Sequence, residues 1–480
     1  MPSIAKNFAY NILLNLSRVV LPLITAPYVS RILEPDGIGI NGFANTYVTY
    51  FVLVALLGIP TYGIREVAKV SDSKEKMSEF VSQMMTIAIV CTLVVTVIFI
   101  VSVFLIPQLA ENYAIILVAG TALYFAPFQI DWFFQGVEKF DFITKRTLAI
   151  RIVSIICIFL FIKEKSDLLL YVAIGALGGV VGNIWSYFAL RKYGVKVKFS
   201  LRNARKHLKP LMILFSSSVA ISVYVLLDTV MLGFISNYSQ VGYYTNATFI
   251  TRTLLMFITS LAAVVIPRLS QYARDKNIAE IETIVRKSFS IISFLAIPMV
   301  VGIFCSAADF STLFFGKEFL GVAWPLAITS LLLIAIGYNN ITGVQILIGM
   351  GFDKLFLKAV LIGAGLNVVL NLILIPFYGA IGASIASVSA ETLILFITYL
   401  FVRRCTDVHI TRILPDILKS LVGCIVFLPL YYLTSLYLTG WGALCAFILL
   451  GALSYFAIEM LMKHSFMGLT KPIINKILHR

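Results

Sequence analysis

The chain has few charged residues for its length. Only 13% of its 480 residues are Asp, Glu, Lys or Arg, whereas 60% are hydrophobic and the mean hydropathy is +0.96. A soluble domain holds about a quarter charged residues, enough to cover a water-facing surface. The composition therefore argues against a water-soluble fold and indicates that lipid is the solvent for most of the chain.

Sequence motifs for nucleotide binding, metal binding and catalysis are also missing. No GxxxxGK[ST] occurs, which excludes a built-in ATPase of that type. The six cysteines show no CxxC or other metal-ligand spacing, and the four histidines lie in polar segments. Every segment between apolar runs is shorter than about 25 residues, which leaves no room for a separate catalytic domain.

Long apolar runs occupy most of the sequence. Each is about 20 residues long, the length at which an α-helix crosses the hydrocarbon of a bilayer, where backbone groups find no water to bond. The sequence therefore predicts an all-α integral membrane protein with about fourteen spanning helices. The predicted spans are 10–32, 41–63, 80–106, 112–134, 143–162, 167–190, 210–235, 244–267, 288–308, 319–347, 355–376, 379–402, 417–438 and 441–462.

Lysine and arginine gather on one side of the predicted membrane. Of the 38 cations, 31 fall in one alternate set of connecting segments or near the two ends of the chain, three in the other set and four within spans. By the positive-inside rule the basic side is cytoplasmic, and both termini are predicted to lie there. The net charge of +15 then reports topology. Nucleic-acid binding would need cations clustered on one soluble face, and here they are spread over short segments.

Two short segments of the chain resemble each other. DGIGINGFAN at 36–45 matches SQVGYYTNAT at 239–248, and the match aligns Gly39 with Gly242. Each copy is followed by an apolar helix that ends near a proline and then by a basic segment. Six predicted helices separate the copies, so both halves would have the same orientation in the membrane, as in transporters built from two parallel repeats.

Three segments carry a resemblance to a known family: LNLSRVVLPLITAPYVSRILEPDGIG near the N-terminus, DWFFQGVEKFDFITKR at 131–146 and LNVVLNLILIPFYGAIGASIASVSAE at 366–391. Together with the number of helices, they resemble the polysaccharide transporter (repeat-unit flippase) branch of the multidrug/oligosaccharidyl-lipid/polysaccharide exporter superfamily. The resemblance implies a V-shaped bundle of two pseudo-symmetric six-helix lobes and two additional C-terminal helices. The corresponding parts of the chain are 1–208, 209–403 and 404–480.

The same resemblance implies a function. The chain would translocate undecaprenyl-diphosphate-linked oligosaccharide repeat units from the inner to the outer leaflet of the bacterial cytoplasmic membrane, for O-antigen, capsule or exopolysaccharide synthesis. It would need no cofactor and would act as a monomer among membrane lipids. Glycosyltransferases and a polysaccharide polymerase would be its partners.

Ionisable residues within the predicted spans are the candidate site residues. Each costs roughly 2.5–3.5 kcal/mol to insert, so each is expected to face a partner or a watery cavity. The guanidinium fork matches a diphosphate, and Arg18, Arg252, Arg31 and Arg151 are the predicted head-group ligands. The alternative is that these arginines pair with Asp228, Glu391 or helix C-termini, or extend to an interface.

A second candidate site would hold a cation. Asn367 and Asn371 are four residues apart and share a helix face, and with Asp228 and Ser387 they offer oxygen ligands that suit a hard monovalent ion. These positions resemble the sodium site of lipid-II flippases in the same superfamily. The resemblance implies Na⁺ coupling, and H⁺ coupling is the other option. The alternative is ordinary hydrogen bonding between helices. Glu391 is a further buried charge.

Several rival functions would need other residues or loops than the repeat-unit flippase. A multidrug/cation antiporter would favour acidic and aromatic cavity residues, whereas a lipid-II-type flippase would share the basic cavity. A membrane polymerase would need a long outer loop, and an acyltransferase would need an intramembrane histidine. The short loops and the polar placement of the histidines favour a transporter over an enzyme; a non-transporting scaffold remains open.

Overall fold

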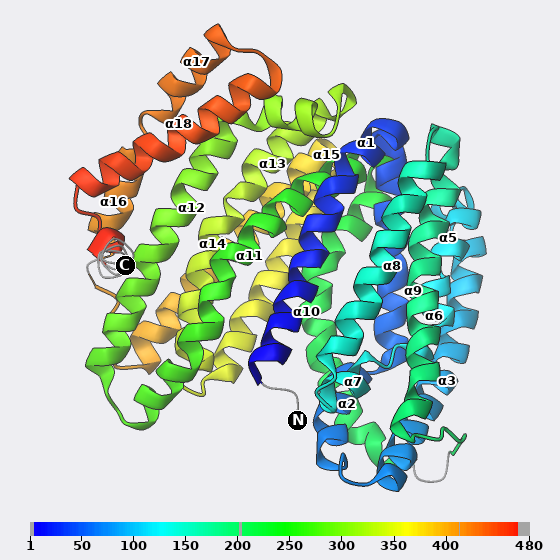
Figure 1. Ribbon diagram of the computed structural model, residues 1–480. Coiled ribbons are helices and arrows are strands. Elements are labelled where there is room, and N and C mark those ends of the chain that lie inside the picture. The colour runs from blue at the N-terminus through cyan, green and yellow to red at the C-terminus, as the bar shows by residue number, and fades with distance from the viewer. Residues whose placement is uncertain (1–3, 201–203, 412, 469–480) are drawn as a thin grey trace. The chain divides into compact units, whose positions relative to one another are not determined.

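The computed structural model describes residues 4–200, 204–411 and 413–468; the side chains of 4–6, 8, 217–225 and 261–264 lie outside the description. Every regular element in these ranges is helical, as the sequence predicts (Figure 1). The elements are α1 (Ile4–Leu56), α2 (Ile59–Lys69), α3 (Lys74–Leu105), α4 (Pro107–Ala110), α5 (Tyr113–Ala119), α6 (Thr121–Tyr124), η1 (Ala126–Phe128), α7 (Asp131–Gly136), α8 (Phe140–Phe161), η2 (Lys165–Asp167), α9 (Leu168–Ala189), η3 (Leu190–Tyr193), η4 (Ala204–His207), α10 (Leu208–Ile235), α11 (Tyr238–Arg274), α12 (Ile278–Phe314), η5 (Lys317–Val322), α13 (Ala323–Ser330), α14 (Leu332–Asn339), η6 (Asn340–Ile348), α15 (Asp353–Cys405), α16 (Leu414–Gly423), α17 (Phe427–Tyr437) and α18 (Gly440–Leu461).

Among the described residues, eight helices are long and apolar enough to cross a membrane. A ninth candidate is the pair Tyr238–Ser260 and Val265–Arg274 of α11, which is bent by 42°. The multi-pass, all-helical membrane fold is therefore confirmed. The count of fourteen spans stays a prediction.

Two of these helices are too long for a single crossing. α1 and α15 each contain 53 residues, which at 1.5 Å per residue is about 80 Å against a hydrocarbon core of about 30 Å. α1 breaks at Glu34 (φ 59°), which precedes Pro35 and is thereby disfavoured in the helical region, and α15 breaks at Gly379 (φ 52°). In α15, Gly363 of the first arm packs against Ile394 of the second, so the arms lie side by side.

The chain forms two compact units, Met1–Gly242 and Tyr243–Arg480, called unit 1 and unit 2 below. The boundary expected at 208/209 differs from this division by α10, which packs on α1 and α2 of unit 1. The C-terminal helices α16, α17 and α18 pack on α12 within unit 2. The three-part division and the V shape stay predictions.

The core of unit 1 fixes the short helix α7 in place. Gly63 of α2 lies against the ring of Trp132, and Gly136 of α7 lies against Val67, so closely that a Cβ on either glycine would overlap its neighbour. The side chains of Phe133 and Phe134 are fully buried in the same cluster. This packing holds Asp131, the first residue of α7, beside α8 and α9.

The two segments of the internal repeat lie against each other in unit 1. A Cβ on Gly39 would overlap the carbonyl oxygen of Tyr238, and a Cβ on Gly242 would overlap that of Pro35. Because the residues exchange roles at the offset of the repeat, the contact has local pseudo-twofold symmetry. It lies where α11 leaves unit 1 for unit 2.

Candidate functional site

Two of the predicted head-group arginines come together in unit 1. The hydroxyl of Thr144 on α8 donates to a carbonyl near the start of α1 (3.1 Å), and the Tyr28 hydroxyl donates to the carbonyl of Ile162 (2.7 Å). The first arm of α1 and α8 therefore run side by side in the same direction. Arg18 and Arg151 lie between these two contacts and are close enough to interact electrostatically.

The two arginines of this pair differ in exposure. Arg18 is exposed and Arg151 is half-buried. The Nη1 atom of Arg151 is buried and meets no hydrogen-bond partner among the described residues. Two neighbouring guanidinium groups repel each other, and an anion with several oxygens would remove the repulsion and accept their hydrogens.

Polar side chains continue from the pair along both arms of α1. Asn11 and Asn15 share the face of Arg18, and the amide of Asn15 donates to Asn11 (3.4 Å). On the second arm the amide of Asn45 donates to the Asn41 side chain (2.7 Å). Asn11 and Asn45 are exposed on a helix of membrane-spanning length, a position at which lipid contact is costly. These faces are suited to a water-filled path.

Arg31 lies apart from the pair along α1, and Arg252 belongs to the other unit. Arg31 is exposed near the end of the first arm of α1, thirteen residues from Arg18, a distance of about 20 Å along the helix. Arg252 is exposed on α11 and belongs to unit 2. The predicted convergence of Arg18 and Arg252 on one cavity stays a prediction.

The four residues of the predicted cation site are divided between the units. Asp228 is 5% exposed in α10 of unit 1, where it interacts electrostatically with Tyr50 of α1. The other three residues lie in α15 of unit 2. Their meeting with Asp228 stays a prediction.

Within unit 2 these polar groups bond to one another and to the backbone. The amide of Asn371 donates to Asn367 (3.1 Å), and both are fully buried. The Ser387 hydroxyl bonds to the Tyr244 hydroxyl of α11 (3.0 Å) and donates to the carbonyl of Ala383 (3.0 Å). The first and third of these bonds lie within α15, and the bond between Ser387 and Tyr244 joins α15 to α11 without an ion.

Glu391 is buried in a second polar network of unit 2. It accepts a hydrogen bond from the amide of Asn339 (3.1 Å), whose carbonyl accepts one from Thr398 (3.3 Å). Thr398 also bonds to Thr342 (2.7 Å) in η6, a π-helix of nine residues. π-Helical turns are frequent at functional sites. The structure describes no group of three or more His, Cys, Asp or Glu side chains that could hold a metal ion.

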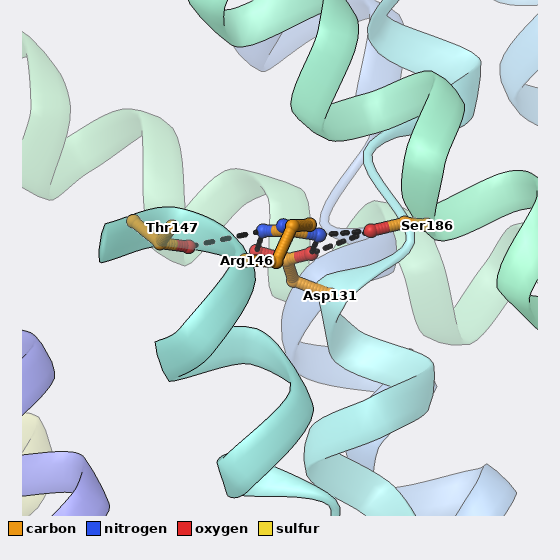
Figure 2. A network of polar contacts seen from close by, with 4 residues as sticks. All are labelled: Asp131, Arg146, Thr147 and Ser186. Carbon is orange, nitrogen blue, oxygen red and sulfur yellow. Dashed lines mark hydrogen bonds and ion pairs between the residues drawn. The ribbon is translucent and has the colours of Figure 1, made fainter. Parts of the chain in front are cut away.

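An ion pair between a buried arginine and a 40% exposed aspartate lies five residues from Arg151, and the sequence had indicated only a basic loop at this point. Figure 2 shows Arg146 of α8 between Asp131 of α7 and Ser186 of α9. The guanidinium donates to both oxygens of Asp131 (2.7 and 2.9 Å), to the Ser186 hydroxyl and to the Thr147 hydroxyl (3.3 Å). The Arg146 side chain is only 6% exposed. The signal for it in the sequence was the segment DWFFQGVEKFDFITKR, whose first and last residues form the pair.

Comparisons with known proteins place the chain among membrane proteins of glycan synthesis. The model of the family described as "Polysaccharide biosynthesis protein" matches residues 4–273. A relative from Escherichia coli (strain K12) named "Putative O-antigen transporter" is 28% identical over 84% of this chain and 97% of its own length. A probable low-salt glycan biosynthesis flippase of Haloferax volcanii is 27% identical over 40% of each chain.

A solved structure has the same fold. The chain is similar to a lipid II flippase, MurJ, in an inward closed conformation, with a TM-score of 0.77 and 18% identity over 96% of this chain and 100% of the other. At this identity the likeness concerns the fold alone.

Proposed function

Because the chain belongs to the family of polysaccharide biosynthesis proteins, we propose that it is a flippase for undecaprenyl-diphosphate-linked oligosaccharide repeat units. It carries them from the inner to the outer leaflet of the bacterial cytoplasmic membrane for O-antigen, capsule or exopolysaccharide synthesis. The relatives that support this are named as transporters and flippases, not as enzymes.

The observation that carries the proposal is the arginine pair of α1 and α8. Arg18 and Arg151 offer planar forks of donors, and one buried nitrogen of Arg151 has no acceptor among the described residues. A diphosphate supplies the oxygens and the negative charge that this arrangement needs. The exposed amides of Asn11 and Asn45, on the first and second arm of α1, would bond to the sugar hydroxyls.

The mechanism follows from the two ends of the substrate. The diphosphate and sugars cannot cross hydrocarbon without a polar path, whereas the prenyl tail has no reason to leave it. The head group would bind in a cavity lined by Arg18, Arg151, Arg252 and Arg31, with the tail in lipid, and alternating access would expose it to each side in turn.

The membrane potential can drive the outward step. Moving two negative charges outward from a negative interior is favoured by about 4–5 kcal/mol at 100 mV. If the arginines move with the charges, this gain falls, and an inward Na⁺ or H⁺ would replace it. We propose Asp228, Asn367, Asn371 and Ser387 as the site for Na⁺, and Glu391 as the acidic group for H⁺.

The proposed orientation puts both termini and the basic segments in the cytoplasm. Glycosyltransferases that build the repeat unit would then act on the side where the flippase receives it. A polymerase would act on the opposite side. The flippase itself is proposed to work as a monomer.

Single substitutions in cells test the head-group site. Arg18→Ala and Arg151→Ala should each lower export by tenfold or more, because each removes a charge-assisted contact worth about 1.5–3 kcal/mol. The measurement is the amount of lipid-linked repeat unit that accumulates on the inner leaflet at matched protein level. Arg205→Ala, which removes an exposed arginine next to α10, is the matched control and should export normally. Normal export by both site variants would remove the proposal.

A further inference from the structure

α16 and α18 of unit 2 enclose a carboxyl group that the proposed function does not use. Glu459 of α18 is 0% exposed, and both of its carboxyl oxygens are buried with no hydrogen-bond partner among the described residues. Gly423, the last residue of α16, lies directly against it, since a Cβ there would stand 2.5 Å from Oε1. The absence of a side chain at 423 is what allows the two helices to close over the carboxyl.

The surroundings of Glu459 are apolar apart from a few titratable groups. From α12 the neighbouring cluster contributes aromatic and aliphatic side chains and one thiol, and Tyr455 of α18 belongs to the same cluster. The titratable and charged groups that face the site from the packed elements are Asp416, Lys419 and Cys424 of the α16 segment, Cys305 of α12, Tyr455 of α18 and His464 after α18.

None of the described cations is bonded to Glu459. The ammonium group of Lys419, the nearest cation, donates to the carbonyl of Lys463 (3.0 Å). His464 is neutral, because its Nδ1 accepts the backbone N–H of Phe466 (3.1 Å) and its Nε2 is left to bond to the Ser420 hydroxyl (3.3 Å). Burial lowers the pKa of His464, in agreement with a neutral ring.

While Lys419 is bonded to the Lys463 carbonyl, an ionised Glu459 would have neither a donor nor a bonded counter-ion among the described residues, in an apolar site. The cost of such a group is several kcal/mol, and buried carboxyls escape it by binding a proton. We infer that Glu459 is a proton-binding site, occupied while Lys419 is bonded to the end of α18 and emptied when Lys419 turns to the carboxylate. On release the O–H bond breaks and the proton passes to water at the end of α18 that carries Lys463.

The same geometry provides the counter-ion for the ionised state. Lys419 is half-buried on α16 and interacts electrostatically with Glu459, so a change of its side-chain conformation away from the Lys463 carbonyl would pair the two charges. The site therefore has two arrangements: a neutral carboxyl with Lys419 bound to the end of α18, and a carboxylate bound to Lys419.

Infrared spectroscopy of the purified full-length protein in lipid tests this directly. A protonated buried carboxyl gives a C=O band distinct from that of a carboxylate. At pH 7 the band should be present in the wild type, lost in Glu459→Gln and retained in the control Glu318→Gln, which removes an exposed carboxyl. Its loss on raising the pH should move upward by about one pH unit in Lys419→Gln, because the counter-ion of the ionised form is gone.

Two results would overturn the assignment. One is a spectrum of Glu459→Gln that keeps the whole band, and the other is a wild-type carboxylate signal at pH 7 that the substitution removes. If Glu459→Gln does not fold, Glu459→Asp replaces it; this variant should keep a protonated band at a shifted position, and its absence would likewise contradict the proposal.

Discussion

Two arginines on α8, five residues apart, show what decides the role of a buried cation. Arg146 has a carboxylate partner, because it donates to Asp131 through two nitrogens and also to two hydroxyls. Arg151 has another arginine as its neighbour. Both have one buried nitrogen without an acceptor among the described residues, so the carboxylate is what distinguishes them. Arg146 holds helices together, and Arg151 is the arginine that we propose to meet an anion.

Arg146→Ala should destabilise unit 1. It removes the charge-assisted hydrogen bonds between α7, α8 and α9, a contribution of about 1.5–3 kcal/mol, and water at the 40% exposed side chain of Asp131 offsets part of the loss. Thermal unfolding of the purified protein measures the loss. Lys145→Ala on the adjacent, exposed position is the control and should unfold as the wild type does. A change in Arg146→Ala no larger than in this control would show that the pair contributes nothing.

His207, next to α10, gives unit 1 a dependence on pH. Its Nε2 lies 2.7 Å from the side-chain amide oxygen (Oε1) of Gln83, and its Nδ1 lies 2.8 Å from the Tyr62 hydroxyl. A neutral ring satisfies both contacts. Burial, and then the charge of Lys206, lower the pKa of His207 from its ordinary 6.5. The folded state therefore disfavours the proton, and stability that is present above pH 6.5 should fall as the pH drops below it.

The measurement for His207 is the unfolding temperature between pH 7.5 and 5. The decline should be smaller in His207→Gln, which keeps an amide in the site but cannot bind the proton. Parallel curves for the two proteins would contradict the assignment of the pH dependence to this ring.

At the scale of elements, the repeat contact brings the backbones of α1 and α11 together at two glycines. Gly39 and Gly242 face the backbone of Tyr238 and Pro35, so a methyl group has no flexible neighbour that could move aside. Gly39→Ala should lower the unfolding temperature and impair export, because the start of α11 would be forced away from α1. Gly179→Ala in α9, where nothing lies within 4 Å of the added Cβ, should have no such effect. Equal behaviour of the two variants would refute the role of the contact.

The sequence predicted most helices and two of the breaks between them, but it did not predict the breaks that fall within an apolar run. The spans expected to end near 32 and begin again at 41, and to end at 376 and begin again at 379, correspond to the breaks at Glu34 and Gly379. Hydropathy does not record a break within an apolar run, so 112–134, expected as one helix, is divided among α5, α6, η1 and α7. The π-helix η6 was missed for the same reason.

The candidate site was predicted only in part, because partners depend on tertiary contacts. The arginines were found from their place in apolar runs, yet the sequence could not say that Arg18 lies beside Arg151, since 133 residues separate them. Arg146 was counted with the basic loops, because its distance from Asp131 along the chain does not reveal that α7 folds back onto α8. The charge of a residue is visible in the sequence, but its burial is not.

At the scale of the whole molecule, the chain combines a large apolar surface with polar faces on long helices. Helices such as α3 and α18 expose aliphatic side chains to the bilayer, whereas the two arms of α1, each long enough to cross the bilayer, present amides and an arginine. A membrane protein keeps such groups only where they contact water or a ligand. We propose that these polar groups and the arginine pair carry a diphosphate head group through the membrane.

The most direct test is flipping by purified protein in liposomes. An undecaprenyl-diphosphate-linked oligosaccharide is placed in one leaflet, and its appearance in the other is followed with and without a membrane potential. We expect transfer by the wild type, faster when the donor side is negative, and a loss of at least tenfold in Arg18→Ala/Arg151→Ala, with Arg205→Ala unchanged. Transfer at the wild-type rate by the double variant would rule out the arginine pair as the head-group site.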